Sequence, residues 1–360
     1  MSPAAATGDP VSVPIAIPGF PVSWAGPGGR DEDFCFGSED GRLHFTTVGG
    51  VPIGGFVSGV ENAEAINGVA FIGPVIAVST RADVTFWTLP RPGSQLAQRA
   101  VFPCGAHGVL ATAAGAFVAP LGRTGLMKVR AGHAAEQLVQ VGRASGRPLS
   151  FYKAVTLHSY GRPEVIVCAA RQDGVVATPL RTDEEWGPLS SLSFPGLDVV
   201  DVCPLGTGTT PPAVAAVGRD GTLVLFDDVL HSRNPVTLRF PQVPGVPYRV
   251  FCALGSLILL TSEGVFVLAG LAERFLAGDR VASTPCRVRP VRSREMVDAN
   301  VCADRWLLAV STDGVLRFDL ERLVRDEGGE RADEMISKPE GLTPSWRPTE
   351  EVAESVPMAG

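Results

Sequence analysis

The stretch LLAVSTDGVLRFDL, residues 307–320, consists of two short apolar runs joined at Thr312, Asp313 and Gly314. Asp-Gly between two such runs is a strong hairpin signal, because tight hairpin turns need positive φ, which glycine adopts without cost and aspartate tolerates. The stretch therefore predicts a β-hairpin.

Six further copies of this pattern lie upstream. They are FCFGSEDGRLHF (34–45), VIAVSTRADVTFW (75–87), AFVAPLGRTGLMKV (116–129), VIVCAARQDGVVATPL (165–180), VAAVGRDGTLVLFD (214–227) and LILLTSEGVFVL (257–268). The seven turns fall at Gly41, Asp83, Gly125, Gly174, Gly221, Gly264 and Gly314, so their spacings are 42, 42, 49, 47, 43 and 50 residues. A period of about 40 to 50 residues with several strands per repeat is typical of a β-propeller. The predicted fold is therefore all-β, a seven-bladed β-propeller.

Each hairpin is preceded by another short apolar run, such as RAVFPCG (99–105) before the third and VVDVCPL (199–205) before the fifth. All hairpins except the last are followed by a weaker strand candidate, such as PVTLRF (235–240) or RVRPV (287–291). We call the four strands of each repeat a, b, c and d in chain order, so the predicted hairpins are the b and c strands. Blades of four strands leave only short edges exposed.

The last repeat lacks a d strand, whereas VSVPIAI (11–17) at the N-terminus has no repeat of its own. We expect this segment to supply the outermost strand of the seventh blade and so to close the ring. Residues 1–10 are expected to be disordered, residues 11–320 to form the propeller, and residues 321–360 to form an acidic flexible tail. Short helices are expected within 271–279 and just after residue 320.

The c strands resemble those of WD40-like propellers, which end in Trp-Asp. Phe226-Asp227 and Phe318-Asp319 stand at the matching positions, with partial versions at Phe86-Trp87 and Phe45. The Gly-His pair that many WD40 repeats carry before strand a is absent. This degenerate resemblance covers residues 11–320 and implies a non-catalytic scaffold that binds a protein or peptide.

Charge and composition limit the class of partner. The formal net charge is −7, and residues 319–360 hold 11 acidic and 5 basic side chains, so the rest of the chain is nearly neutral. A basic footprint, which nucleic-acid binding usually needs, is missing. No apolar run reaches the roughly 18 residues that would span a bilayer, and no signal peptide is evident. We therefore expect no nucleic-acid partner, no membrane and a cytoplasmic location. Only 3 of the 31 basic residues are lysine, an arginine bias that suggests a GC-rich bacterial genome.

One set of residues suggests a binding surface. Four consecutive b–c turns carry an arginine, namely Arg81, Arg123, Arg171 and Arg219, while the remaining turns carry Glu39, Glu263 and Asp313. Guanidinium groups bind carboxylate or phosphate in bidentate geometry. We expect the four arginines to bind an acidic or phosphorylated segment, and the acidic tail itself is a further candidate for self-interaction. The alternative interpretation is that these are ordinary solvated turn residues.

Catalysis finds little support in the sequence. The five histidines, His44, His107, His133, His158 and His231, share no spacing, and no catalytic motif is present. His107 and His158 are placed in a–b connections, on the face opposite the arginines. The seven cysteines include no CxxC pair, so no metal or cofactor is expected and the thiols should be reduced core residues. A propeller enzyme, a hydrolase or lyase acting on a small molecule at the channel mouth, remains the alternative. A sugar-binding propeller is disfavoured because the five tryptophans do not recur at equivalent positions.

Overall fold

The computed structural model describes residues 12–15, 21–29, 33–57, 64–88, 97–123, 125–130, 138–139, 143–144, 147–148, 150–157, 164–170, 174–180, 190–192, 197–206, 213–231, 235–279, 288–292, 296–311 and 314–325. The chain divides into two compact units, residues 1–327 and 328–360, and every described residue belongs to the first. The predicted disordered N-terminus, and the acidic tail beyond residue 325, lie outside the described residues.

Within the described residues, the strands form seven four-stranded antiparallel sheets and one two-stranded sheet. Each four-stranded sheet is numbered here in chain order. Sheet 1 contains β2 (Val22–Pro27), β3 (Asp33–Ser38), β4 (Arg42–Thr47) and β5 (Pro52–Val57). Sheet 2 contains β6 (Gly68–Ile72), β7 (Val75–Ser79), β8 (Val84–Thr88) and β9 (Ala97–Phe102). Sheet 3 contains β10 (Leu110–Ala111), β11 (Ala116–Pro120), β12 (Leu126–Arg130) and β13 (Leu138–Val139).

The same strand order continues through the second half of the chain. Sheet 4 contains β16 (Phe151–Leu157), β17 (Glu164–Ala170), β18 (Gly174–Leu180) and β19 (Ser190–Leu192). Sheet 5 contains β20 (Val199–Pro204), β21 (Val214–Gly218), β22 (Thr222–Phe226) and β23 (Val236–Arg239). Sheet 6 contains β24 (Pro247–Ala253), β25 (Ser256–Thr261), β26 (Gly264–Leu268) and β27 (Val288–Arg292). The two-stranded sheet, β14 (Arg143–Ala144) and β15 (Arg147–Pro148), lies between sheets 3 and 4 in the chain.

Sheet 7 joins the two ends of the described chain. Its strands β28 (Met296–Cys302), β29 (Trp306–Ser311) and β30 (Gly314–Asp319) are followed not by a fourth strand but by helix α2 (Leu320–Arg325). The fourth strand is β1 (Ser12–Ile15), which pairs antiparallel with β30 in a register that places Ser12 opposite Phe318. The N-terminal segment expected to complete the last repeat therefore pairs where the sequence predicted.

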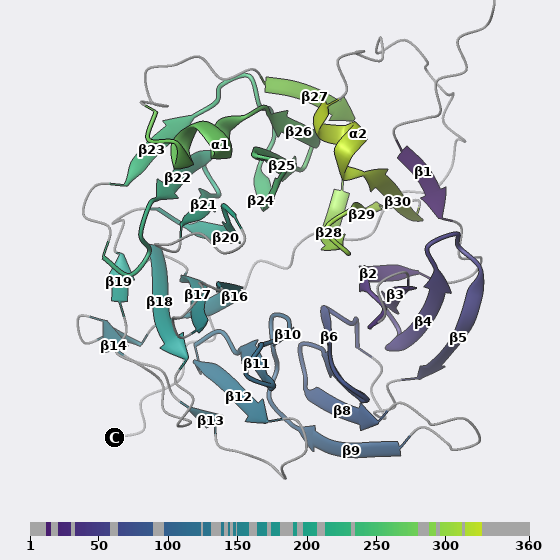
Figure 1. The fold of residues 1–360 in the computed structure, drawn as a ribbon. Helices are drawn as coiled ribbons and strands as arrows, with labels where there is room; N and C mark the ends of the chain where they lie inside the picture. The colour runs from purple at the N-terminus through teal and green to yellow at the C-terminus, as the bar shows by residue number, and fades with distance from the viewer. Residues whose placement is uncertain are drawn as a thin grey trace, which may run out of the picture. The chain divides into compact units, whose positions relative to one another are not determined.

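The inner and outer strands differ in burial. In Figure 1 the first strands of the sheets face a common centre, while β5, β9, β23 and β27 lie farthest from it. The b strands are buried along nearly their whole length, as in β7, β21 and β25, whereas β23 alternates between half-buried and exposed. Central strands covered on both faces need continuous apolar runs, which explains why the b and c strands were the clearest signals in the sequence.

Apolar clusters join neighbouring sheets. Separate clusters link sheets 1 and 2, 2 and 3, 4 and 5, 5 and 6, and 6 and 7. Another cluster packs Phe34 and Phe36 of sheet 1 against Leu308 and Val310 of sheet 7. Sheets 3 and 4 are joined through the backbone, where Gly122 and Phe151 exchange hydrogen bonds of 2.9 and 3.0 Å.

One strand assignment was wrong. The run at 99–105 was predicted to be the first strand of the third repeat, but its residues 99–102 belong to β9, the outer strand of sheet 2. Phe102 packs edge-to-face on Phe86 with the ring centroids 5.5 Å apart, which holds β9 on sheet 2. The first strand of sheet 3 is instead the two-residue β10, whose Leu110 and Ala111 give too short a run to be recognised.

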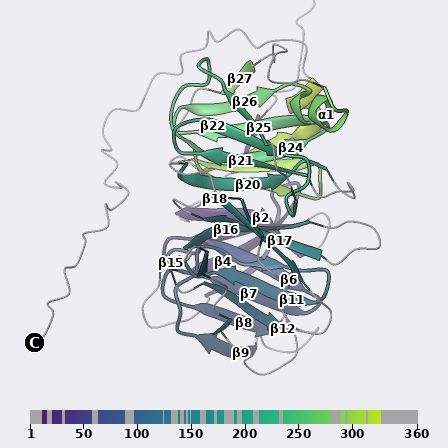
Figure 2. The same ribbon diagram turned by 90° about the vertical axis from the view of Figure 1, so that its left-hand side faces the viewer.

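The described helices are short. Helix α1 (Leu271–Leu276), within the predicted segment, lies at the ends of the strands (Figure 2), where the Glu273 amide donates a 2.9 Å hydrogen bond to the Gly255 carbonyl in the a–b turn of sheet 6. Helix α2 begins at Leu320, next to the predicted position. With six residues each, neither of these helices has the length or hydropathy needed to cross a membrane.

Candidate functional site

The b–c turns lie at the same end of the sheets as the segments that enter the a strands. The amides of Glu39, Arg219 and Ser262, each at a b–c turn, donate to the carbonyls of Pro21, Asp198 and Val246, which precede the a strands of the same sheets. These three hydrogen bonds measure 2.9 to 3.0 Å. We call this end of the sheets the turn face. The turn face contains the b–c turns of Arg81, Arg123 and Arg219, which are the predicted arginines that the structure describes.

The four predicted arginines differ in their environments. Arg81 and Arg123 are exposed, and among the described residues neither makes an ion pair or side-chain hydrogen bond. Arg219 is also exposed, but its Nε donates to Asp198 Oδ2 at 2.9 Å, so its charge is partly neutralised. Arg171 lies outside the described residues. Two guanidinium groups, on sheets 2 and 3, are therefore available to a partner.

The acidic turn residues are less informative. Glu39 and Glu263 are exposed at the turns of sheets 1 and 6, as the sequence placed them, whereas Asp313 lies outside the described residues. Glutamate is mostly exposed in folded proteins, so its presence at solvated turns needs no binding role. We assign them no role in binding.

Arg81 and Arg123 stand on either side of one short segment, residues 105–108, which leads into β10. On the Arg81 side, the Ala106 amide donates to the Thr80 carbonyl at 2.9 Å, and a Cβ at Gly105 would lie 1.8 Å from the carbonyl oxygen of Arg81. On the Arg123 side, the His107 amide donates to the Pro120 carbonyl at 2.8 Å. The two turns are therefore held against the same stretch of backbone.

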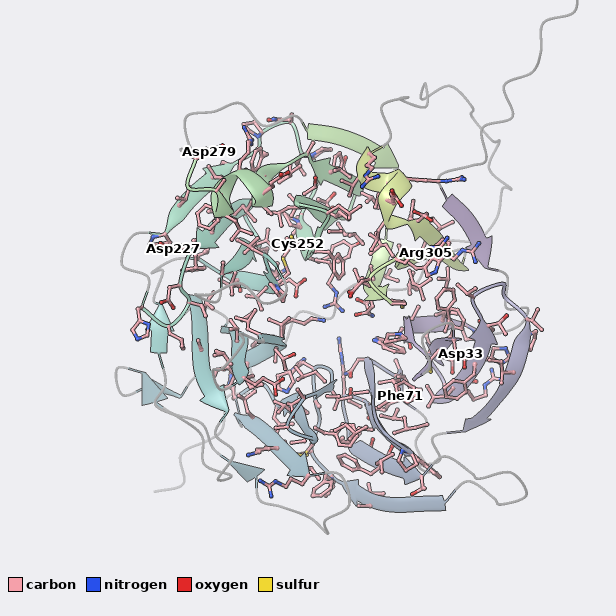
Figure 3. The ribbon with its side chains drawn as sticks, in the orientation of Figure 1. Asp33, Phe71, Asp227, Cys252, Asp279 and Arg305 are labelled. Carbon is pink, nitrogen blue, oxygen red and sulfur yellow. The ribbon has the colours of Figure 1, made fainter. Side chains whose placement is uncertain are left out.

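The segment 105–108 also borders a cavity of about 470 Å³. The walls come mainly from the inner strands β2, β6, β10, β16 and β28, and Figure 3 draws the described side chains around them. Trp24, Val69 and Phe71 provide apolar surface, and Phe71 is labelled in the figure. The polar side chains of the lining are Asn67, His107, Lys153 and Asn300.

The register of the inner strands explains how charged side chains reach this region. In sheets 1, 4, 5, 6 and 7 the pairing of strands a and b shifts at a bulge near the start of strand a. The residues that follow these bulges are Trp24, Lys153, Asp201, Arg249 and Asp298. A bulge re-aims the side chains that follow it. Sheets 4 to 7 thus carry charges of alternating sign at one equivalent position, and we call Lys153, Asp201, Arg249 and Asp298 the inner charge row.

Three members of the inner charge row form one buried network. Arg249 Nε donates to Asp298 Oδ1 at 2.7 Å, its Nη2 makes a second, short hydrogen bond to the same oxygen, and its Nη1 lies 3.7 Å from Asp201 Oδ1. Asp201 is 1% exposed, and its Oδ2 accepts a 2.9 Å hydrogen bond from the Val250 amide in the next sheet. The network therefore bridges the inner strands of sheets 5, 6 and 7.

One arginine serves two aspartates in this network. Burial raises the pKa of Asp201 well above its usual range, and the nearby Asp298 carboxylate raises it further. The pKa of Asp298 is also raised by burial, although Arg249 opposes that shift through its charge and its hydrogen bonds. Asp201 Oδ1 is buried and makes no hydrogen bond with another described residue. The arrangement favours keeping one proton on the aspartate pair.

His107 was placed wrongly from the sequence. It was expected in an a–b connection on the face opposite the arginines, but it precedes β10 and lies on the turn face, because the run before it belongs to β9. Its ring centroid is 4.6 Å from that of Tyr152. Of the other histidines, His133 and His158 lie outside the described residues.

The inner charge row was not predicted from the sequence, although a signal for it is present. Aligning FYKAV (151–155), VVDVC (199–203), PYRVF (247–251) and MVDAN (296–300) places a charged residue third in every one of these inner strands. The bulges that orient these side chains are a property of strand pairing and could not be read from one strand alone.

No cluster of three or more histidine, cysteine or acidic side chains suited to a metal ion occurs among the described residues. Five of the cysteines, Cys35, Cys104, Cys203, Cys252 and Cys302, are free thiols. Burial raises the pKa of Cys252 to about 11 and that of Cys302 to about 12, which disfavours the reactive thiolate at neutral pH. Cys35, Cys203 and Cys302 are buried, as the sequence predicted, whereas Cys104 and Cys252 are half-buried.

Comparison with known proteins gives likeness in fold alone. No protein-family model matches the chain, and no curated protein sequence matches it. The computationally designed protein Ika8 is similar in structure, with a TM-score of 0.58 and 13% identity over 83% of each chain. BBS1N, solved in complex with ARL6DN, has a TM-score of 0.56 and 15% identity over 88% of this chain and 98% of that chain.

Proposed function

We propose that the seven four-stranded sheets are the blades of one closed seven-bladed β-propeller. Three observations support closure: β1 pairs with β30, an apolar cluster joins sheet 7 to sheet 1, and BBS1N, a propeller-like structure, is similar over most of its length. Fraying of the ring would expose the edge of β30 and part of the apolar surface between the first and last sheets, which is unfavourable in water.

We propose further that the protein is a non-catalytic scaffold that binds an acidic or phosphorylated segment of a partner protein on the turn face. The observation that carries this proposal is the pair of exposed guanidinium groups, Arg81 and Arg123, without an ion-pair partner among the described residues and on either side of segment 105–108. Charge-assisted bidentate hydrogen bonds suit carboxylate and phosphate ligands. BBS1N was itself solved with a bound protein, which gives one case of this kind of fold presenting a binding surface.

Arg81 and Arg123 are expected to contribute most of the binding free energy for an acidic or phosphorylated segment. Arg219 already has a carboxylate partner in Asp198, so a ligand would have to compete for its guanidinium group. Hydrogen bonds that involve charged groups contribute about 1.5 to 3 kcal/mol each. Loss of both free arginines should therefore weaken binding by at least about tenfold, which corresponds to about 1.4 kcal/mol.

The proposal can be tested with an immobilised array of acidic, phosphorylated and neutral peptides, one of which is the segment 328–360 of this chain. The wild-type protein is compared with R81E/R123E and with R322E/R325E, which makes the same charge change on helix α2. We expect that some acidic or phosphorylated peptides will bind both the wild type and the R322E/R325E variant, and that these peptides will not bind R81E/R123E. Equal binding by all three proteins, or no preference for acidic peptides, would refute the proposal.

A further inference from the structure

The cavity beside segment 105–108 holds a cation without a matching anion. Lys153 is half-buried in the lining, and its ammonium group makes no hydrogen bond or ion pair with another described residue. The cavity lining contains no carboxylate among the residues that the structure describes. Removing an ammonium group from water without a partner is costly, so a bound anion would recover that cost.

The neighbouring carboxylate in the inner charge row does not neutralise Lys153. Asp201, at the equivalent position in the next sheet, directs its oxygens towards sheet 6, where Oδ2 accepts from the Val250 amide and Oδ1 faces Arg249. Asp298 is held by Arg249 and by the Ala299 amide. The charges of the row are therefore balanced locally in sheets 5 to 7, and Lys153 stands apart from them.

We infer that this cavity is a binding site for a small organic anion, whose carboxylate or phosphate group pairs with Lys153. A volume of about 470 Å³ lies within the range of small-molecule sites. Trp24, Val69 and Phe71 would cover an apolar part of the ligand. The site goes beyond the peptide-binding role of Arg81 and Arg123 and does not depend on it.

Two amide side chains in the lining are held in place by hydrogen bonds. Asn67 Nδ2 donates to the Ala106 carbonyl at 2.6 Å and its Oδ1 accepts from Ser79 Oγ at 2.7 Å, while Asn300 Nδ2 donates to the Ala25 carbonyl at 2.7 Å. Each amide nitrogen has a second hydrogen that these bonds do not use. Donors fixed before the ligand arrives lose little conformational freedom on binding.

The choice of lysine at position 153 agrees with an anion site. Arginine supplies 28 of the 31 basic residues, so lysine is the unusual cation of this chain. Its ammonium is a compact point charge that pairs with a single anionic group, whereas guanidinium needs room for a planar fork. The anionic group can come from a free small molecule or from an acidic side chain of a docked peptide, and the experiment below separates these two sources.

The small number of lysines permits a direct test by NMR. Lysine labelled with ¹³C at Cε gives three signals, from Lys128, Lys153 and Lys338, which the variants K153R and K338R assign. The full-length protein is titrated with inorganic phosphate, with benzoate, and with an acidic peptide. We expect the Lys153 signal to shift and saturate with phosphate or benzoate, while the Lys338 signal shows only a small linear drift. Saturation with the peptide alone would assign the anion to the partner and overturn a small-molecule site, and no saturable shift at Lys153 with any of the three would overturn the inference altogether.

A variant provides the second measurement. K153M removes the charge but keeps an unbranched side chain, and it should lose the anion affinity at least tenfold and lose the rise in Tm that the anion produces in the wild type. K153M should still bind acidic peptides on the turn face as the wild type does, so the failure of this site and that of the turn face can be distinguished. An unchanged anion-induced rise in Tm in K153M would contradict the inference, and the NMR titration of the wild type decides the matter if K153M does not fold.

Discussion

At the scale of single residues, the chain places its most costly groups where the inner strands meet. Asp201, Arg249 and Asp298 come from three consecutive sheets and are all largely buried. Replacing a buried ion pair with apolar groups is often neutral or stabilising. Removing only one partner leaves a buried charge without a counter-charge and costs about 3 to 5 kcal/mol. The three side chains should therefore respond very differently to substitution.

R249M should be the most damaging of these substitutions. It leaves the buried aspartate pair without its counter-charge, and we expect the free energy of unfolding to fall by about 3 to 5 kcal/mol at pH 7. D201N keeps an oxygen that can accept from the Val250 amide and matches the uncharged form of Asp201 that burial favours, so it should be neutral or stabilising. Urea unfolding at pH 7 measures both changes, and a D201N variant as unstable as R249M would contradict this account.

The same network predicts how stability depends on pH. Because burial raises the pKa of Asp201 above its value in the unfolded chain, the folded protein holds that proton more tightly. This contribution to stability is complete below the unfolded pKa and is lost as the pH rises through the folded pKa. D201N should therefore lose less stability than the wild type between pH 4 and neutral pH, and parallel pH profiles for the two proteins would argue against a raised pKa.

At the scale of elements, a strand could be predicted from the sequence only where its own residues form a clear apolar pattern. The b and c strands are continuous apolar runs around glycine turns, and Gly41, Gly125 and Gly221 indeed have positive φ. The fourth strand of sheet 7 was predictable because the last repeat lacks a d strand, whereas the N-terminal segment has a strand-like run that belongs to no repeat. The cavity was not predictable, because its lining comes from the inner strands of five sheets, and the two-residue β10 carries no pattern of its own.

Deleting residues 1–16 tests the role of β1. The deletion removes the strand that pairs with β30 and leaves the backbone groups of that edge exposed. We expect a loss of several kcal/mol in stability and a tendency to self-associate through β30. Calorimetry and analytical ultracentrifugation measure the two effects. Removing residues 1–10 alone is the control, and if the longer deletion behaves as the shorter one does, β1 is not needed to complete sheet 7.

Gly105 tests how the Arg81 turn is held. A Cβ at this position would lie 1.8 Å from the Arg81 carbonyl oxygen, so G105A must displace the turn or the segment before β10. We expect a loss of about 1 to 3 kcal/mol in stability, as for other overpacked sites, and weaker binding of acidic peptides. G49A is the matched control, since its new Cβ would make only an ordinary 3.7 Å contact and should change stability by less than about 0.5 kcal/mol. Equal effects of the two substitutions would contradict the close approach.

At the scale of the whole molecule, the sheets bring together residues that are far apart in the chain. Arg81 and Arg123 belong to different sheets, and the cavity beside them joins side chains from position 24 to position 301. The exposed guanidinium groups of Arg81 and Arg123 and the half-buried Lys153 in the cavity therefore come from three different sheets. The central claim about the molecule is that its turn face recognises negative charge through Arg81 and Arg123.

The most direct test of that claim is a calorimetric titration of the best acidic or phosphorylated peptide into the wild type, R81E/R123E and R322E/R325E at low and high salt. We predict that R81E/R123E binds at least tenfold more weakly than the wild type, that the helix α2 variant binds as the wild type does, and that salt weakens the wild type most, because exposed charge pairs are screened. An affinity that is the same in all three proteins and insensitive to salt would contradict the claim.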